Sequence, residues 1–235
     1  PKLEGLNKLT IDRLLNSKSK FAKNISNKFS NEFPNLEQKD LIKRLDIESK
    51  LIKDKLTEKE NFKYPKYIIK IKMEKHGKFL SDEFFNNYNW MLKVYFDDVL
   101  QEEETNEITG IPPEEIKLEI DFPIYDCQQM FYSCEHIKEI DFVEFDTSKV
   151  TNMRSMFSDC DSLVKVNVDK FDTSKVTNMS SMFYKCSSLK KLDLLSFKIN
   201  NVTDMSAMFL LCYSLSDLNF DFSKINTDKL ENITS

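Results

Sequence analysis

The sequence predicts an α+β protein in which a mostly helical N-terminal cap region, residues 1–110, precedes a short repeat solenoid, residues 111–235, with a parallel β-sheet and short helices. Two observations lead to this prediction. The C-terminal half repeats every 26 residues, whereas the N-terminal half has no repeat and begins with apolar residues at helical spacing. The chain has 235 residues, of which 40% are hydrophobic and 31% charged, so it can bury a substantial core.

The repeat is visible as columns of similar residues. A Met-Phe pair recurs four times, beginning at Met130, Met156, Met182 and Met208. A cysteine follows each pair, at Cys134, Cys160, Cys186 and Cys212. The stretches Phe145–Met153 and Phe171–Met179 are identical, and a partial fifth unit begins near Leu230. One unit cannot cover its own apolar face, so we expect successive units to stack with their strands parallel.

Within a unit, the hydrophobic spacing changes from helical to extended. Apolar residues first recur at i, i+3, i+4 and i+7, which predicts one face of a short helix: Met153, Met156, Phe157 and Cys160. Thr151 and Asn152 stand where an N-cap is expected. The next apolar residues alternate as in a strand: Leu163, Val166 and Val168. A turn at Asp172–Ser174 follows, because these side chains bond their own backbone.

The cysteines are predicted to be small buried residues with free thiols. Four of them share one interior column of the repeat, and Cys127 occupies a methionine column. A disulfide between stacked neighbours is the less favoured alternative, because their side chains would point the same way. A metal site has no Cys-x-x-Cys spacing to support it.

The N-terminal half is predicted to begin with two helices, over residues 11–29 and 35–56, that pack as a hairpin. Residues 67–73 alternate as a strand, with a turn at His76–Gly77. Residues 84–100 are apolar nearly all round; we favour a buried helix over the alternative of a strand at 90–96. Residues 116–122 alternate again, and we expect this strand to lie next to the first strand of the repeat.

The charges of the N-terminal half are separated along the chain. Residues 1–80 carry 20 Lys and Arg against 11 Asp and Glu, and residues 81–123 carry 2 against 12. The basic stretch indicates either contact with phosphate-rich partners or a solvated helix surface that balances the acidic segment. We favour the second interpretation and predict no nucleic-acid binding.

Several classes of function are disfavoured by composition. The three glycines, Gly5, Gly77 and Gly110, stand too far apart to form a phosphate-binding loop. The two histidines, His76 and His136, lie in different regions of the sequence, which excludes a helical His-Glu-x-x-His zinc site. We therefore predict no catalytic residue, cofactor, metal ligand or small-molecule substrate, and no enzymatic activity. No apolar stretch is long enough for a transmembrane helix.

The repeat resembles a known family of surface proteins. Residues 176–186 read Val-Thr-Asn-Met-Ser-Ser-Met-Phe-Tyr-Lys-Cys, and residues 189–197 read Leu-Lys-Lys-Leu-Asp-Leu-Leu-Ser-Phe. Both stretches are similar to the repeats of BspA-like leucine-rich repeat proteins. The resemblance covers residues 125–235 and implies a curved leucine-rich-repeat solenoid that binds macromolecules, often on microbial surfaces, without catalysis or cofactor. The first unit departs from the pattern at residues 124–127.

These observations predict a non-enzymatic protein–protein interaction module, with an intracellular scaffold or accessory structural subunit as the alternative. The cellular location stays open, because interior thiols suit a reducing compartment and the resemblance suggests the cell surface. The binding face is expected on the outward side of the sheet, between the inward apolar residues. It comprises Glu139, Lys165, Lys191 and Asp217 in one column and Asp141, Asn167, Asp193 and Asn219 in a second. The second column is equally well explained as a side-chain ladder that serves only the sheet, and calcium would need a denser ligand set.

Overall fold

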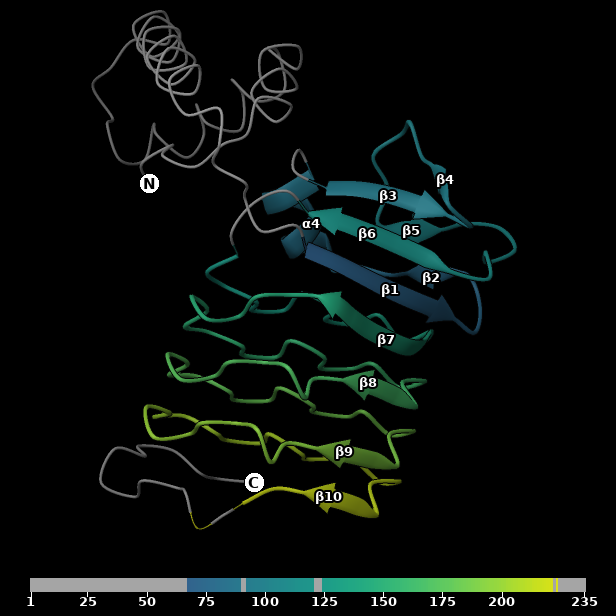
Figure 1. Ribbon diagram of the computed structural model, residues 1–235. Helices are drawn as coiled ribbons and strands as arrows, with labels where there is room; N and C mark the ends of the chain where they lie inside the picture. The colour runs from purple at the N-terminus through teal and green to yellow at the C-terminus, as the bar shows by residue number, and fades with distance from the viewer. Residues whose placement is uncertain (1–66, 90–91, 121–123, 222, 224–235) are drawn as a thin grey trace, which may run out of the picture. The chain divides into compact units, whose positions relative to one another are not determined.

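The computed structural model describes residues 67–89, 92–120, 124–221 and 223 (Figure 1). The chain divides into two compact units, Pro1–Pro65 and Lys66–Ser235, and the described residues all belong to the second. The helices expected over residues 11–29 and 35–56 lie outside the described residues.

The described residues form one α-helix, α4 (Asp82–Tyr88), and ten strands. The strands are β1 (Tyr67–Met73), β2 (Gly77–Lys78), β3 (Leu92–Phe96), β4 (Val99–Leu100), β5 (Glu107–Ile108), β6 (Ile116–Ile120), β7 (Ile137–Glu144), β8 (Lys165–Asn167), β9 (Lys191–Asp193) and β10 (Asp217–Asn219). Six strands form one sheet in the order β4-β3-β6-β1-β7-β8. Within it only the β7–β8 pair is parallel; β9 and β10 form a second parallel pair, and β2 and β5 an antiparallel pair.

The first strand of the repeat, β7, has a different neighbour from the one expected. The strand predicted at residues 116–122 forms as β6, but β1 lies between β6 and β7 and is antiparallel to both. The expected contact of residues 116–122 with the repeat was therefore wrong. The strand predicted at residues 67–73 is confirmed, and its inward residues Ile69 and Ile71 are fully buried.

The apolar stretch at residues 84–100 contains both of the structures that we considered. Helix α4 begins after Ser81, whose Oγ accepts a hydrogen bond from the backbone N–H of Phe84 at 3.1 Å. The chain then forms β3 and turns back into β4 through Asp97 and Asp98, which have φ values of 48° and 65°. The preference for a helix was therefore wrong over residues 92–96.

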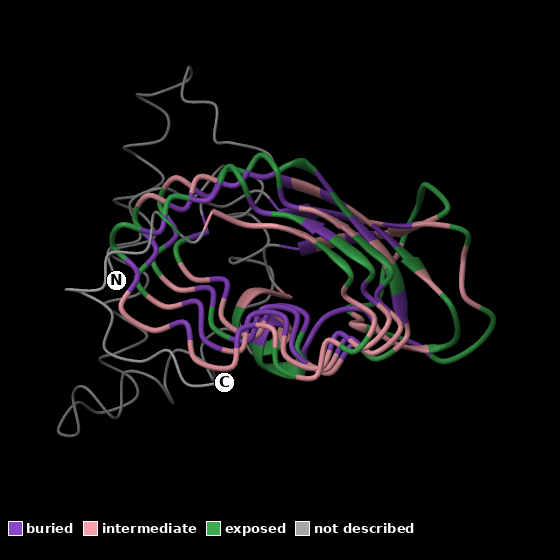
Figure 2. Cartoon of the chain, turned by 90° about the horizontal axis from the view of Figure 1, so that it is seen from below, coloured by how far each residue is buried: buried purple, intermediate pink, exposed green. Residues whose placement is uncertain are grey.

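The repeats stack on one another through their backbones (Figures 1 and 2). Alternate N–H groups of one repeat donate to carbonyl groups of the next, as Ser155 does to Ser180 and Phe157 to Met182, both at 2.9 Å. The intervening N–H groups close tight turns within the repeat, such as Met156 to the carbonyl of Met153 at 3.2 Å. Two residues of each such segment have positive φ, for example 53° at Ser155.

The predicted fold class was wrong. The regular secondary structure of the described residues is mostly β-strand, and their single α-helix lies outside the repeats, so among these residues neither the mostly helical cap nor the solenoid with short helices was found. An α-helix uses its N–H groups internally, four residues back, whereas half of these N–H groups bond to the next repeat. Successive tight turns bury the same i, i+3, i+4 and i+7 positions as a helix would. The residues predicted to face inward, Met153, Met156, Phe157 and Cys160, are all buried.

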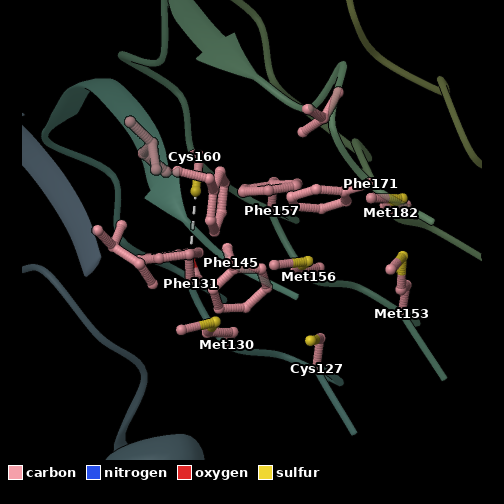
Figure 3. Packing of buried hydrophobic residues seen from close by; sticks show 14 of the residues in the cluster. Cys127, Met130, Phe131, Phe145, Met153, Met156, Phe157, Cys160, Phe171 and Met182 are labelled. Carbon is pink, nitrogen blue, oxygen red and sulfur yellow. Dashed lines mark hydrogen bonds between the residues drawn. The ribbon is translucent and has the colours of Figure 1, made fainter. Parts of the chain in front are cut away.

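Two columns of phenylalanine rings form the interior of the stack (Figure 3). In the first column the rings are nearly parallel, with centroid separations of 5.7, 5.2 and 6.1 Å between Phe131, Phe157, Phe183 and Phe209. The second column consists of Phe145, Phe171 and Phe197, with separations of 5.6 and 6.4 Å. Phe142 packs between the two columns. Each repeat therefore places its rings over those of the preceding repeat.

The cysteine column runs beside the first ring column. The predicted burial is confirmed for Cys127, Cys134, Cys160 and Cys186, whereas Cys212 is half-buried. The Sγ of Cys160 donates a hydrogen bond to the carbonyl oxygen of Phe131 at 3.2 Å, drawn as a dashed line in Figure 3. All five thiols are free in the structure, and burial raises the pKa of each of them.

Candidate functional site

The eight residues expected to bind a partner lie on β7, β8, β9 and β10, and we call them the outer face. Register places Glu139 opposite Lys165 and Asp141 opposite Asn167. In the same way Lys191 is opposite Asp217, and Asp193 is opposite Asn219. The residues between the two columns, such as Ile140 and Leu192, are buried, so strand alternation turns the charged residues toward solvent. The outer face exposes Asp141, Lys165, Lys191, Asp193 and Asp217, with Glu139, Asn167 and Asn219 half-exposed.

The second column forms hydrogen bonds between neighbouring strands. The Nδ2 of Asn167 donates to Oδ1 of Asp141 at 3.4 Å, and that of Asn219 to Oδ2 of Asp193 at 3.1 Å. The backbone N–H of Leu195 and the amide of Asn219 both donate to Asp193 and hold the pKa of its carboxyl below the usual value. These bonds are what a side-chain ladder requires, so this column has a role within the sheet itself.

The first column has the charge sequence negative, positive, positive, negative from β7 to β10. At its ends, Glu139 pairs with Lys72 of β1 at 3.1 Å, and Asp217 pairs with Lys191 at 2.8 Å. Lys165 is exposed and has no carboxylate within ion-pair distance among the described residues. Among the described residues, the column therefore presents one unpaired cation, Lys165, next to Lys191, whose ion pair is exposed to solvent.

A hollow of about 430 Å³ opens where β1, β7 and β8 adjoin. It is lined by Lys70, Lys72, Glu115, Glu139, Ile140, Asp141, Lys165 and Asn167. Four of these residues belong to the outer face as predicted from the sequence. Lys70, Lys72 and Glu115 were missed. Lys70 and Lys72 lie on β1, which was not expected beside the first repeat, and Glu115 lies just before β6 and reaches the hollow through its ion pair with Lys70. The alternation of lysines in residues 67–73 was the signal that could have placed Lys70 and Lys72 on an outward face.

The described residues contain no group of three or more His, Cys, Asp or Glu side chains arranged to hold a metal ion. The two histidines, expected in different regions, approach one another with ring centroids 6.5 Å apart. Gly77 allows this approach, because its φ is 138° and a Cβ there would lie 3.0 Å from Cδ2 of His136. Two imidazoles alone do not complete the set of ligands that a structural zinc site needs.

Comparison with known proteins finds a match to one family model, over the repeats. A family model described as a Mycoplasma protein of unknown function, DUF285, matches residues 125–235, the stretch that contains the repeats. No curated protein and no solved structure matches the sequence. In the part of the chain that the structure describes, no helix is both long and apolar enough to span a bilayer.

Proposed function

We propose that this protein is a non-enzymatic protein–protein interaction module and that the outer face, together with the adjoining hollow, is its binding surface. The observation that supports the proposal most directly is the array of charged side chains on four successive strands, bordered by a hollow large enough to admit a partner's side chain. The resemblance of the repeats to BspA-like surface proteins agrees with an adhesive role of this kind.

The physical basis of the proposal is the rigidity of the backbone beneath the charges. Strands β7 to β10 are each anchored by a buried or half-buried apolar residue, so a partner would order few additional degrees of freedom on binding. Ion pairs between exposed side chains, such as Lys191 with Asp217, contribute only about 0–1 kcal/mol. Such pairs exchange readily for new pairs with a partner.

A second candidate function is an intracellular scaffold or accessory structural subunit. The observation that favours it is the set of five free thiols, four of them fully inside the fold, because proteins of reducing compartments retain such thiols. The gene sequence upstream of Pro1 distinguishes the two: a secretory or lipoprotein signal supports the surface role, and a bare initiator Met supports the scaffold.

The test compares two double charge reversals in the full chain. Lys165→Glu with Lys191→Glu alters the outer face, and Lys149→Glu with Lys175→Glu alters exposed lysines of the turns. Partner proteins captured by the wild type are quantified for each variant by mass spectrometry, and the strongest is titrated. We expect the face reversal to weaken its binding by about 1–3 kcal/mol and the turn reversal to leave it unchanged. A turn reversal that weakens binding while the face reversal does not would place the binding surface elsewhere.

A further inference from the structure

Lys165 differs from the other lysines around the hollow. Lys70 pairs with Glu115 at 2.8 Å, and Lys72 pairs with Glu139 at 3.1 Å. Lys165 lines the same hollow but forms no ion pair with any described carboxylate. A cation without a partner, at the edge of a hollow, favours the approach of a negatively charged group.

Lys191 provides a second cation beside the first. It occupies the equivalent position of the next repeat, on β9, and Figure 1 shows β9 following β8 in the stack. Neighbouring strands lie roughly 4.8 Å apart. Two lysines at equivalent positions of successive repeats repel one another in the free protein, and a pair of carboxylates at the repeat spacing would relieve that repulsion.

We propose that the partner presents two acidic side chains, about 5–6 Å apart, to Lys165 and Lys191. Basic side chains on either side of this acidic pair meet Glu139 and Asp217. This inference rests on the proposed binding role of the outer face. Glutamates at i and i+4 of a helix have this spacing. The negative, positive, positive, negative order of the column thus selects a partner helix with the inverse order of charges.

The surroundings of the hollow favour carboxylates over a phosphate group. Glu115, Glu139 and Asp141 line it together with the three lysines, so the hollow carries no net positive charge. A dianionic phosphate gains no net attraction from a hollow without net charge, whereas a single carboxylate can approach Lys165 from the side of β9. The partner is therefore expected to bind through acidic side chains of a protein.

The experiment uses two fluorescent 20-residue helical peptides of identical composition. The matched peptide has Glu at i and i+4 with Lys one turn beyond on each side, and the swapped peptide exchanges Glu and Lys. Both are titrated against the full chain by anisotropy at about 20 mM salt, where screening is weak. We expect the matched peptide to bind about three- to tenfold more tightly. Lys165→Glu with Lys191→Glu makes all four residues of the column negative and should abolish the preference, whereas Lys149→Glu with Lys175→Glu should preserve it.

Equal affinities of the two peptides, or a preference that survives the face reversal, would overturn the proposal. Displacement of the matched peptide by millimolar inorganic phosphate would indicate a general anion site and overturn the proposal as well.

Sedimentation velocity tests whether a second copy of the chain is the partner. A dimer that the face reversal abolishes would assign the outer face to self-association instead. If the face reversal loses partner binding but the peptides are not distinguished, the interaction role stands and the acidic pair is rejected. Should the reversed variant fail to fold, Lys165→Gln with Lys191→Gln replaces it and should reduce the preference, because only Glu139 and Asp217 then remain to distinguish the peptides; an unreduced preference would overturn the proposal.

Discussion

The thiol of Cys186 donates a hydrogen bond to the carbonyl oxygen of Phe157, 3.1 Å away in the preceding repeat. Cys212 has the same relationship to Phe183, at 2.9 Å. The donor and acceptor are 29 residues apart in each case, so the thiol column connects consecutive repeats just as the backbone does. A thiol that is buried and already donates in this way is a structural group rather than a reactive one.

The buried thiols predict a loss of stability at alkaline pH. Burial raises the pKa of Cys160 and Cys186 well above the ordinary value, so these thiols stay protonated in the folded chain while those of the unfolded chain ionise. The free energy of unfolding should therefore be unaffected below the ordinary thiol pKa of about 8.5 and fall above it, by up to about 1.4 kcal/mol per pH unit for each thiol. Urea unfolding between about pH 7 and pH 10 measures the slope. In the double variant Cys160→Ala, Cys186→Ala, this slope should be smaller by the contribution of about two thiol protons. An unchanged slope would contradict the burial of these two thiols.

The same burial predicts the order of thiol modification. In native protein without reductant, Cys212 should react first with a thiol reagent, because it is only half-buried. In denaturant all five thiols should titrate as free. Recovery of three or fewer would mean that disulfides form among the stacked cysteines.

The ring column predicts a large cost for removing one phenylalanine. Phe183 is fully buried and stacks on Phe157 at 5.2 Å and on Phe209 at 6.1 Å. Phe183→Ala should lower the free energy of unfolding by about 3–5 kcal/mol, measured by urea denaturation. Tyr213→Ala is the control, because that ring is 79% exposed and should cost little. A Phe183→Ala protein that melts within about 1 °C of the wild type would contradict the stacked core.

A buried hydroxyl predicts a second stabilising contact between repeats. The Oγ1 of Thr173 donates to the carbonyl of Lys198 at 3.1 Å and accepts from its N–H at 2.7 Å. Thr173→Val keeps the shape but leaves both backbone groups without this partner, so we expect a loss of about 1–3 kcal/mol. Thr173→Ser, which keeps the hydroxyl, should recover most of it. Thr151→Val at an exposed position is the matched control, and an equal loss there would show that the hydroxyl of Thr173 is unimportant.

The position of β1 predicts that the repeats depend on a strand outside them. Ile71 is fully buried and lies opposite Ile140 of β7. Ile71→Asp would bury an unpaired charge and should unfold the repeats together with the sheet in one transition. Lys72→Gln, at the next and exposed position, should change stability by less than about 1 kcal/mol. Hydrogen exchange resolved by segment distinguishes joint unfolding from loss of β1 alone.

Features set by local sequence could be predicted. The 26-residue columns identified the buried Met, Phe and Cys residues, and the turn expected at Asp172 forms through its Oδ1, which accepts from the N–H of Ser174 at 3.1 Å. The outward direction of Lys165 and Lys191 followed from strand alternation. Each of these depends only on residues close in the chain.

Features set by distant pairing could not be predicted. Helix and tight turns bury the same positions, and only the bonds to the next repeat, such as Ser155 to Ser180, decide between them. The insertion of β1 beside β7 depends on pairing across more than 60 residues, which no local pattern encodes. The hollow was missed for this reason, since Lys70 and Lys72 reach it only through that pairing.

The mixed pairing of β7 has a consequence for the number of repeats that this architecture can carry. Strand β7 pairs with β1 on one side and with the next repeat on the other. The pairing among β1, β3, β4 and β6 therefore does not depend on how many repeats follow. The identical stretches Phe145–Met153 and Phe171–Met179 give neighbouring repeats the same residues, so one further 26-residue unit would stack on either neighbour in the same way. Each unit gained or lost would shift the outer face by one strand, roughly 4.8 Å, and add or remove one residue in each column. A change in repeat number would thus alter the length and charge order of the outer face while the interior keeps its composition.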